Sequence, residues 1–300
     1  MSGRDIFLAY AGHINIDIVL QVDHLTDDIT NKVSSVEEQF GGTAGNFAMV
    51  ASSLKFPFLI YSIVSGRSHG KYLEFLKGKG IDSSGITVTE DSFGPICYAV
   101  NDGLKQKYYM AEGPMTNVVY MKNDDHFKYL HLSTGDPSSN LDLSERGNFE
   151  KLVFDPSQEV FYKYGKAELD KFLNKADFIM GNENEIQHIS KTTGTSMVDI
   201  VSTGTVIIET RGHSGTMIYG KKEILVPSKV VNGKINTLGA GDSFRAGFYY
   251  GLYKKLSLEE SVACGNVVAG IAVSSGVRNF HADPEDIVQK AKMLSHDIIS

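Results

Sequence analysis

Short apolar runs alternate with helical patterns along most of the chain, and this alternation constrains the fold more than any other feature. The apolar runs are typical of buried strands: IFLAYAG, FLIYSIV, YLHLS, KLVFD, ADFIMG, GTVIIET and GTMIYG. Helical patterns such as Gly45 to Leu54 lie between them, and two long helices, Gly241 to Lys254 and Leu258 to Ser274, follow. Strands that alternate with helices form a parallel sheet covered by helices on both faces. We therefore expect an α/β fold.

Two segments interrupt the alternation. Residues Ile14 to Phe40 and Phe93 to Met115 mix polar and apolar residues and contain turn sequences such as Asn101-Asp102-Gly103. They are typical of antiparallel hairpins outside the main sheet. A β-layer over the carboxyl edge of the sheet, where ligands bind in open α/β folds, would act as a lid. We expect residues 1–300 to form one domain, with lid segments at about 14–40 and 93–115 inserted in it.

The composition favours small-molecule partners. The chain has 300 residues, 42% of them hydrophobic, and a net charge of -7 without a long basic run. This balance gives no electrostatic surface for nucleic acid or for an anionic membrane. Only Cys97 and Cys264 occur, so neither a disulfide framework nor a Cys-rich metal site is indicated. No stretch approaches a membrane-spanning length and the start does not fit a signal peptide, so we expect a cytoplasmic protein.

The stretch Gly66 to Lys71, GRSHGK, superficially resembles a phosphate-binding P-loop. That loop needs four residues between its glycines and a Ser or Thr after the Lys, which holds magnesium. Here three residues separate the glycines and Tyr72 follows the Lys. We therefore interpret GRSHGK as a loop that leads into a helix.

The stretch Asn236 to Phe244, NTLGAGDSF, places a carboxylate at the start of a predicted helix beside a glycine-rich backbone. Helix N-termini expose unpaired N–H groups with partial positive charge, and glycines let a ligand approach them. This arrangement favours a phosphate. A carboxylate beside a phosphate is useful if it removes a proton, as phosphoryl transfer to an alcohol requires. The alternative is an N-cap Asp with glycines that only make a turn.

Three further motifs favour ligand binding, although each has an ordinary structural explanation. GGTAGNFA passes from two glycines, Gly41 and Gly42, into a helix, and its Asn46 could bond a hydroxyl-rich ligand or simply belong to a turn and cap. Asp17 follows the first strand and could accept hydrogen bonds from two adjacent hydroxyls, or be a solvated loop residue. The NENE stretch, Asn182 to Glu185, could hold Mg²⁺ through water or be an acidic helix start.

In this order the motifs resemble the PfkB/ribokinase family of carbohydrate and nucleoside kinases. GGTAGNFA is similar to the amino-terminal signature of the family and NTLGAGDSF to its carboxyl-terminal signature, and the similarity covers nearly the whole chain. The resemblance implies a ribokinase-like three-layer α/β/α fold with a mostly parallel central sheet and a small β-sheet lid. It also implies ATP as the phosphoryl donor and Mg²⁺ as a cofactor.

The resemblance further implies roles for individual residues. It makes Asp242 the catalytic base and the backbone of Gly239, Ala240 and Gly241 the anion hole. It assigns Asp17, Gly42 and Asn46 to the sugar of the acceptor. It assigns Asn182 and Glu185 to phosphate and magnesium, with Glu185 at the metal, and Thr210, Gly212 and Asn266 to the nucleotide site. Asn236 and Leu238 depart from the family pattern where many members build a monovalent-cation site, which puts potassium activation in doubt.

The chain looks most like the archaeal-type nucleoside kinases of this family, and adenosine is the acceptor we expect, phosphorylated at its primary hydroxyl. Aromatic and soft apolar residues in the lid segment offer surface for a base: Phe93, Tyr98, Tyr108, Tyr109 and Met110. Their alternative role is lid core or a dimer seam. The second hypothesis is a ribokinase-like or fructokinase-like sugar kinase. A non-catalytic nucleotide sensor is disfavoured by the intact Asp242. Two assemblies are open: a monomer whose lid closes on the acceptor and the main domain, or a homodimer in which two lids pack together, and of these we favour the homodimer.

Overall fold

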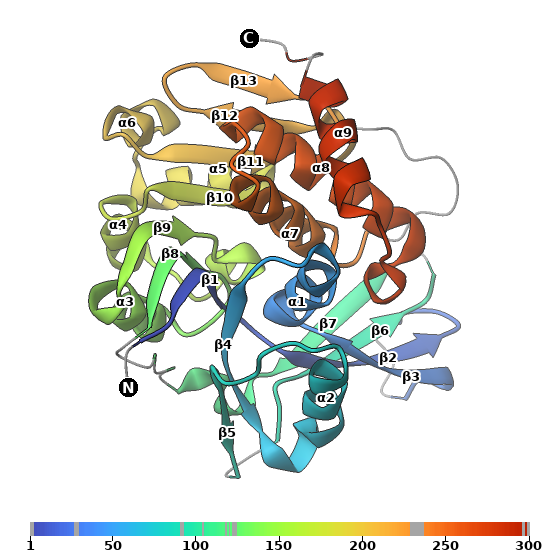
Figure 1. The fold of residues 1–300 in the computed structure, drawn as a ribbon. Helices are drawn as coiled ribbons and strands as arrows, with labels where there is room; N and C mark the ends of the chain where they lie inside the picture. The colour runs from blue at the N-terminus through green and yellow to red at the C-terminus, as the bar shows by residue number, and fades with distance from the viewer. Residues whose placement is uncertain are drawn as a thin grey trace.

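The computed structural model describes residues 3–26, 30–90, 93–103, 105–117, 119, 121, 125–228, 237–295 and 298. Within these ranges a nine-stranded sheet is covered by helices on both faces, and a smaller four-stranded sheet lies at one side (Figure 1). The predicted fold class, a three-layer α/β fold with a second small sheet, is confirmed. None of the described helices combines the length and apolar character needed to cross a membrane.

The main sheet has the strand order β13-β12-β11-β10-β9-β8-β1-β4-β5. Its strands are β1 (Asp5–Ala11), β4 (Phe58–Ser65), β5 (Ile86–Thr89), β8 (His126–Leu132), β9 (Phe149–Phe154), β10 (Phe178–Asn182), β11 (Val206–Thr210), β12 (Thr216–Tyr219) and β13 (Glu223–Val226). All neighbours from β11 to β5 pair in parallel, whereas β12 and β13 are antiparallel. The central strands are apolar throughout because helices cover both of their faces.

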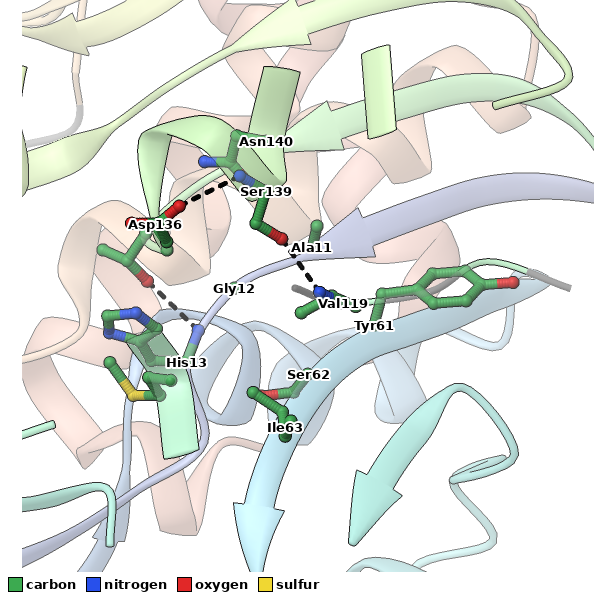
Figure 2. Close-up of a pocket in the computed structure, with 13 residues that line it drawn as sticks. Ala11, Gly12, His13, Tyr61, Ser62, Ile63, Val119, Asp136, Ser139 and Asn140 are labelled. Carbon is green, nitrogen blue, oxygen red and sulfur yellow. Dashed lines mark hydrogen bonds between the residues drawn. The ribbon is translucent and has the colours of Figure 1, made fainter. Parts of the chain in front are cut away.

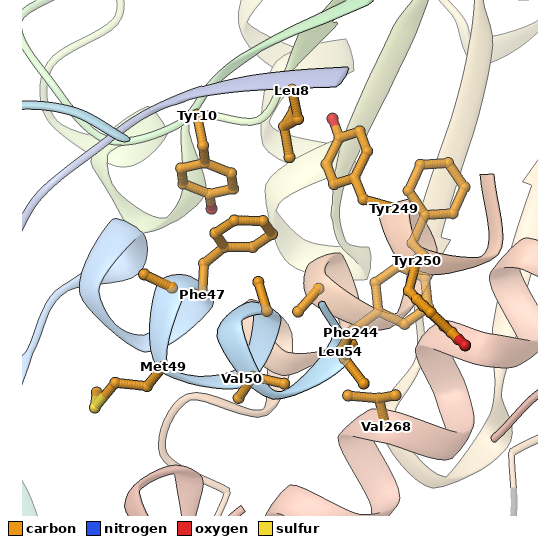
Figure 3. Packing of buried hydrophobic residues seen from close by; sticks show 14 of the residues in the cluster. Leu8, Tyr10, Phe47, Met49, Val50, Leu54, Phe244, Tyr249, Tyr250 and Val268 are labelled. Carbon is orange, nitrogen blue, oxygen red and sulfur yellow. The ribbon is translucent and has the colours of Figure 1, made fainter. Parts of the chain in front are cut away.

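Each face of the sheet has its own hydrophobic core. One core packs under α1 (Thr43–Leu54), α2 (Gly66–Gly78), α7 (Ala240–Tyr253), α8 (Leu258–Ser275) and α9 (Pro284–Ser295). The other packs under α3 (Pro137–Arg146), α4 (Lys166–Leu173), α5 (Glu183–Thr193) and α6 (Met197–Ser202). In the first core the Tyr10 ring of β1 stacks on Phe47 of α1 at 4.2 Å between centroids, close to Tyr249 of α7 (Figure 3). These contacts hold α1 and α7 against β1.

The interpretation of GRSHGK as a loop was wrong, because α2 begins at Gly66 and contains the whole stretch. The Ser65 side chain accepts a hydrogen bond from the Arg67 N–H and so caps the helix, a role for which serine is well suited. Tyr72 and Leu76 then bury the apolar face of α2. Capping and this buried face outweigh the helix-weakening glycines at both ends of the stretch.

The two interrupting segments form hairpins, and the hairpins pair with each other. The small sheet has the order β3-β2-β6-β7, from β2 (Asn15–Val22), β3 (Val33–Gly41), β6 (Ile96–Asn101) and β7 (Gln106–Ala111). β2 pairs with β6 in parallel, and the two outer pairs are antiparallel. The Ser65 N–H at the end of β4 donates to the Gly94 carbonyl, which ties the small sheet to the carboxyl edge of the main sheet. Ligands of open α/β folds bind at this edge.

Candidate active site

The first turn of α7 has the form that the sequence predicts for an anion site. Gly239 precedes the helix with φ +73°, and among the described residues no side chain caps this end. A Cβ at Gly239 would also lie 2.6 Å from Val277, so glycine is required here for two reasons. The Ala240 N–H is already used by the Thr237 carbonyl at 3.1 Å. The remaining N–H groups of the turn point along the helix axis, where the helix dipole favours an anion.

Asp242 lies in this turn and is only 6% exposed. One of its carboxylate oxygens accepts a hydrogen bond from Asn46 Nδ2 at 2.9 Å, and the other accepts one from Arg245 NH1 at 2.9 Å. Burial raises the pKa of Asp242 to about 6, against the opposing effects of Arg245 and Asn46. A carboxyl with that pKa is mostly ionised at neutral pH yet basic enough to take a proton, as a general base requires.

The residues predicted to bind the acceptor lie together near Asp242: Asp17, Gly42 and Asn46. Asp17 is in β2, and its carboxylate lies so close to Gly41 that a Cβ there would be 2.0 Å from Oδ2. Gly42 has φ +85° and contacts the backbone of the loop before β2, so a side chain at either glycine would disturb the site. Burial raises the pKa of Asp17 to about 7, Arg278 lowers it and the charge of Asp242 raises it further. Asp17 and Asp242 are therefore close enough to interact.

The residues predicted for phosphate and nucleotide lie along the carboxyl edge on the far side of α7. Asn182 ends β10 and pairs in register with Thr210 at the end of β11. Asn182 and Glu185 form a capping box, with Asn182 N–H donating to Glu185 Oε2 at 2.8 Å and Glu185 N–H donating to Asn182 Oδ1 at 3.0 Å. Burial raises the pKa of Glu185, and the charge of Asp155 raises it further.

Gly212 and Asn266 lie further along the same edge. Gly212 has φ +55° in the turn after β11. The Asn266 side chain accepts from Thr216 Oγ1 at 2.7 Å and donates to the carbonyls of Val226 and Pro227 at 3.1 Å, so it ties α8 to β12 and to the end of β13. The structure therefore explains Asn266 as a structural tie, and its nucleotide role stays a prediction. Asn236 lies outside the described residues.

The sequence reasoning missed the residue that pairs with the candidate base. Arg245 is 6% exposed, and its guanidinium bridges Asp242 to Asp155, which is fully buried at the end of β9. Burial alone would lower the pKa of Arg245, and the Asp155 and Asp242 carboxyls raise it, so the group stays charged. A signal existed: Arg245 is the single charged residue in the apolar stretch FRAGFYYGLY, and buried arginines are almost always paired.

A small cavity lies beside the site, on the α3 side of the β1 and β4 ends (Figure 2). It is lined by Gly12, His13, Ser62 and Asp136, among others, and its volume is about 10 Å³, about what one water molecule needs. None of the predicted site residues lines it. The buried polar groups around Asp242 therefore lie outside this cavity.

Comparison with known proteins assigns the fold to a class of kinases. A solved nucleoside kinase of Methanocaldococcus jannaschii superposes with a TM-score of 0.87 at 25% identity, covering 97% of this chain and all of that one. A Burkholderia thailandensis nucleoside kinase in complex with inosine gives a TM-score of 0.83 over 95% of this chain and 97% of its own, and at 20% identity that likeness bears on the fold alone. A nucleoside kinase of Thermoplasma acidophilum is 36% identical over 95% of this chain and 96% of its own length.

These likenesses define the class as α/β kinases with a ribokinase fold. The model of the pfkB family of carbohydrate kinases matches residues 5–282, and the chain belongs to this family. The predicted resemblance is thereby confirmed. The roles that the resemblance implies for individual residues stay predictions.

Proposed function

We propose that the protein is an ATP-dependent kinase that phosphorylates the primary, 5′-type hydroxyl of a nucleoside, and that adenosine is a preferred acceptor. The observation that carries the kinase chemistry is the buried Asp242 in the first turn of α7, next to Asn46 and within electrostatic reach of Asp17. The relatives named as nucleoside kinases, one of them 36% identical, support the nucleoside acceptor.

The proposed transfer needs three contributions from this chain. Asp17 holds two hydroxyls of the acceptor sugar and so places the third, primary hydroxyl near Asp242. As the hydroxyl oxygen forms its bond to the γ-phosphorus and the bond to the β,γ-bridging oxygen breaks, the proton passes to a carboxylate oxygen of Asp242 and ADP leaves. At the dipole end of α7 the backbone of the predicted anion hole, Gly239, Ala240 and Gly241, stabilises the negative charge of the phosphoryl group, with the Ala240 N–H bonded to the Thr237 carbonyl and so contributing through the helix dipole.

The residues at the ends of β10 and β11 fit a nucleotide–magnesium site. In the described residues no group of three or more His, Cys, Asp or Glu side chains is arranged to hold a metal ion. Mg²⁺ needs none, because it keeps several waters and commonly binds through one or two carboxylates and the substrate phosphates. Glu185, with Asn182 and Thr210 beside it, would supply such a carboxylate, and a bound Mg²⁺ would offset the negative charge of the phosphates.

The register of the small sheet shows which of the residues predicted to contact a base lie on the same face of the sheet as Asp17. Asp17 pairs with Cys97 and Cys97 with Met110, and in the next row Ala99 pairs with Tyr108, so Met110 and Tyr108 share the face of Asp17. The Asp17 and Cys97 charges help raise the pKa of Tyr108, after burial, which agrees with this placement.

Tyr98 and Tyr109 lie opposite each other on the other face of the small sheet. Phe93 lies outside both strands. Among these aromatic residues we therefore propose Tyr108, which is 54% exposed, as the stacking surface for the base, together with Met110.

A panel of acceptors tests the proposal. ADP production is measured with adenosine, inosine, cytidine, ribose and fructose at fixed ATP and Mg²⁺. A nucleoside kinase has the highest kcat/KM with a nucleoside, whereas higher values with ribose or fructose would favour the sugar-kinase alternative. Tyr108→Ala and Tyr109→Ala form a matched pair: the first should raise KM for a nucleoside about 10-fold or more and the second should leave it near the wild-type value. Equal effects of both variants would contradict the assignment of faces.

The face of the small sheet that carries Tyr98 and Tyr109, opposite to the face of Asp17, supports a homodimer. Val36 is 65% exposed and Tyr98 is 40% exposed on this face, where a twofold partner would cover both. Light scattering over a dilution series measures the mass directly. A monomer at micromolar concentration would refute the dimer and leave the kinase proposal intact, because the site residues come from one chain.

A further inference from the structure

The candidate base belongs to a buried cluster of three charged groups. The guanidinium of Arg245 holds Asp155 with two N–H groups, through Nε and through NH2, the second at 2.7 Å from Oδ1. Its third nitrogen, NH1, donates to Asp242 Oδ1 at 2.9 Å. Asp155 is fully buried, and Arg245 and Asp242 are each 6% exposed. One rigid fork therefore links the end of β9 to the first turn of α7.

The charges of the cluster do not cancel. Two carboxylates and one guanidinium leave one net negative charge in a site where water is largely excluded. The bidentate contact pairs Arg245 first with Asp155, so the charge left over resides on Asp242. Asn46 donates to the other oxygen of Asp242, and a carboxylate has about four lone-pair positions, so room remains for an acceptor hydroxyl.

We propose that Arg245, clamped by Asp155, is the positioning residue that keeps Asp242 ionised and fixes the direction of its free lone pairs toward the acceptor hydroxyl. This inference rests on the proposed role of Asp242 as the base. Asp155 has two functions in it. It orients the guanidinium of Arg245. It also weakens the electrostatic effect of Arg245 on Asp242, so that Asp242 stays basic enough to accept a proton.

Other titratable groups also face this cluster. Charge interactions reach Asp242 or its partners from β1, β2, α2, β8, α5 and α7, through Tyr10, Asp17, Tyr72, His131, Glu185 and Tyr249 respectively. His131 Nε2 lies 3.6 Å from Asp155 Oδ2, and burial keeps the His131 pKa well below its ordinary value, so this ring is neutral. Arg245 is therefore the cation of the cluster that bonds Asp242 directly.

The alternative explanation is that the cluster only ties α7 to β9. A tie of that kind would lower stability when broken but would not change how the folded enzyme responds to pH. The two explanations therefore differ in the pH profile of the chemical step. The positioning role predicts that loss of Arg245 and loss of Asp155 shift the pH profile in opposite directions, because Arg245 lowers the pKa of Asp242 whereas Asp155 raises it.

The test measures the single-turnover rate constant, at saturating nucleotide and acceptor, between about pH 5 and 9 for Arg245→Met, Arg245→Lys and Asp155→Asn. In Arg245→Met the acidic limb of the pH–rate profile should move up by about one pH unit or more, which lowers the rate at pH 6 by about 5-fold or more, and the rate should recover as the pH rises. In Asp155→Asn the limb should move down, with a lower plateau. Arg245→Lys should lie between wild type and Arg245→Met.

Arg4→Met is the matched control. Arg4 also pairs with two carboxyls, Asp82 and Asp125, but it lies before β1, at the opposite end of the strand from the site. Its loss should lower stability without shifting the limb.

Every outcome separates this inference from the proposed base. If Asp242→Asn turns over normally, the base assignment falls and this inference with it. If Asp242→Asn is inactive but Arg245→Met and Asp155→Asn keep the wild-type limb, Asp242 remains the base and the positioning role is refuted. If Arg245→Met does not fold, the double variant Arg245→Met/Asp155→Asn removes the unpaired buried charge. An unshifted limb in that variant together with an unshifted limb in Asp155→Asn would overturn the proposal.

Discussion

The most informative perturbation of the acceptor site is a change of pH, compared between the wild type and Asp17→Asn. Burial raises the pKa of Asp17 to about 7, so this carboxyl changes charge close to neutral pH. When ionised, it accepts hydrogen bonds from two adjacent hydroxyls, and each charge-assisted bond contributes roughly 1.5–3 kcal/mol. When protonated, it loses the charge that strengthens both bonds. Acceptor affinity should therefore fall as the pH falls through 7.

The expected size follows from the two carboxyl groups of the site. Between pH 8 and pH 6 the ionised fraction of a group with a pKa of about 7 falls about 10-fold. Asp242, with a pKa of about 6, loses about half of its ionised form over the same range. The kcat/KM for the acceptor should therefore fall about 20-fold, while kcat at saturating acceptor falls only about 2-fold.

The assay is a set of initial-rate measurements against acceptor concentration at each pH, with ATP saturating. Asp17→Asn should have a lower kcat/KM at pH 8 and only the remaining, about 2-fold, dependence on pH. Wild-type enzyme with 2′- or 3′-deoxy acceptors provides the second arm, because an acceptor with one hydroxyl fewer cannot use both bonds. A kcat/KM profile as steep in Asp17→Asn as in the wild type would refute the role of Asp17, as would equal affinity for deoxy acceptors.

Three further outcomes are expected. Asp242→Asn should leave KM for both substrates near the wild-type values and lower kcat by ~100-fold or more, and near-normal turnover would exclude Asp242 as the base. Gly247→Ala should lower the free energy of unfolding by about 1–3 kcal/mol in a denaturant titration, because its Cβ would lie 2.5 Å from the Cys264 carbonyl oxygen of α8. Unchanged stability would mean that α7 and α8 can move apart to accept the methyl group. Asp17→Asn should have a higher Tm than the wild type at pH 8, and this difference should disappear toward pH 4. The folded-state pKa of Asp17 is raised, so ionising this carboxyl lowers the stability of the wild type increasingly from pH 4 to 7, and the Asp17→Asn variant does not have this cost. Thermal scans at each pH measure the difference.

The fold could be predicted from sequence where the pattern was strong. Seven apolar runs and the long helices at the carboxyl end correspond to strands and helices of the structure, with the helix ends displaced by a few residues at most. Weak elements were missed, namely the four-residue strands β5 and β13 and the helices α3 and α6. Short edge strands bury few side chains, so their patterns hardly differ from loops. α3 did carry a signal, Asp136 before Pro137, and the Asp136 side chain caps the helix as such a pair predicts.

The site could be predicted only in part, for a physical reason. Signature motifs specify backbone shape, and Gly42, Gly239 and Asp242 occupy the positions that such shape requires. Contacts between distant segments depend on packing: Arg245 meets Asp155 from 90 positions away, and the faces of Tyr108 and Tyr109 follow from the register of three strands. Local pattern does not encode such register. Only the presence of a charge in an apolar helix indicated that Arg245 needed a partner.

Departures from the rules of stable folding gather around this site. Asp17 and Asp242 are desolvated enough for their pKa values to rise, which costs stability at neutral pH. Gly42 and Gly239 take left-handed conformations in crowded positions, and no side chain in the described part of the chain caps the helix that begins at Ala240. Each departure leaves something an anionic, hydroxyl-bearing ligand can use: a free carboxylate lone pair, an approachable backbone, an unpaired N–H group. Because these features coincide at one end of α7, their burial and backbone conformation support the proposed phosphoryl-transfer site there.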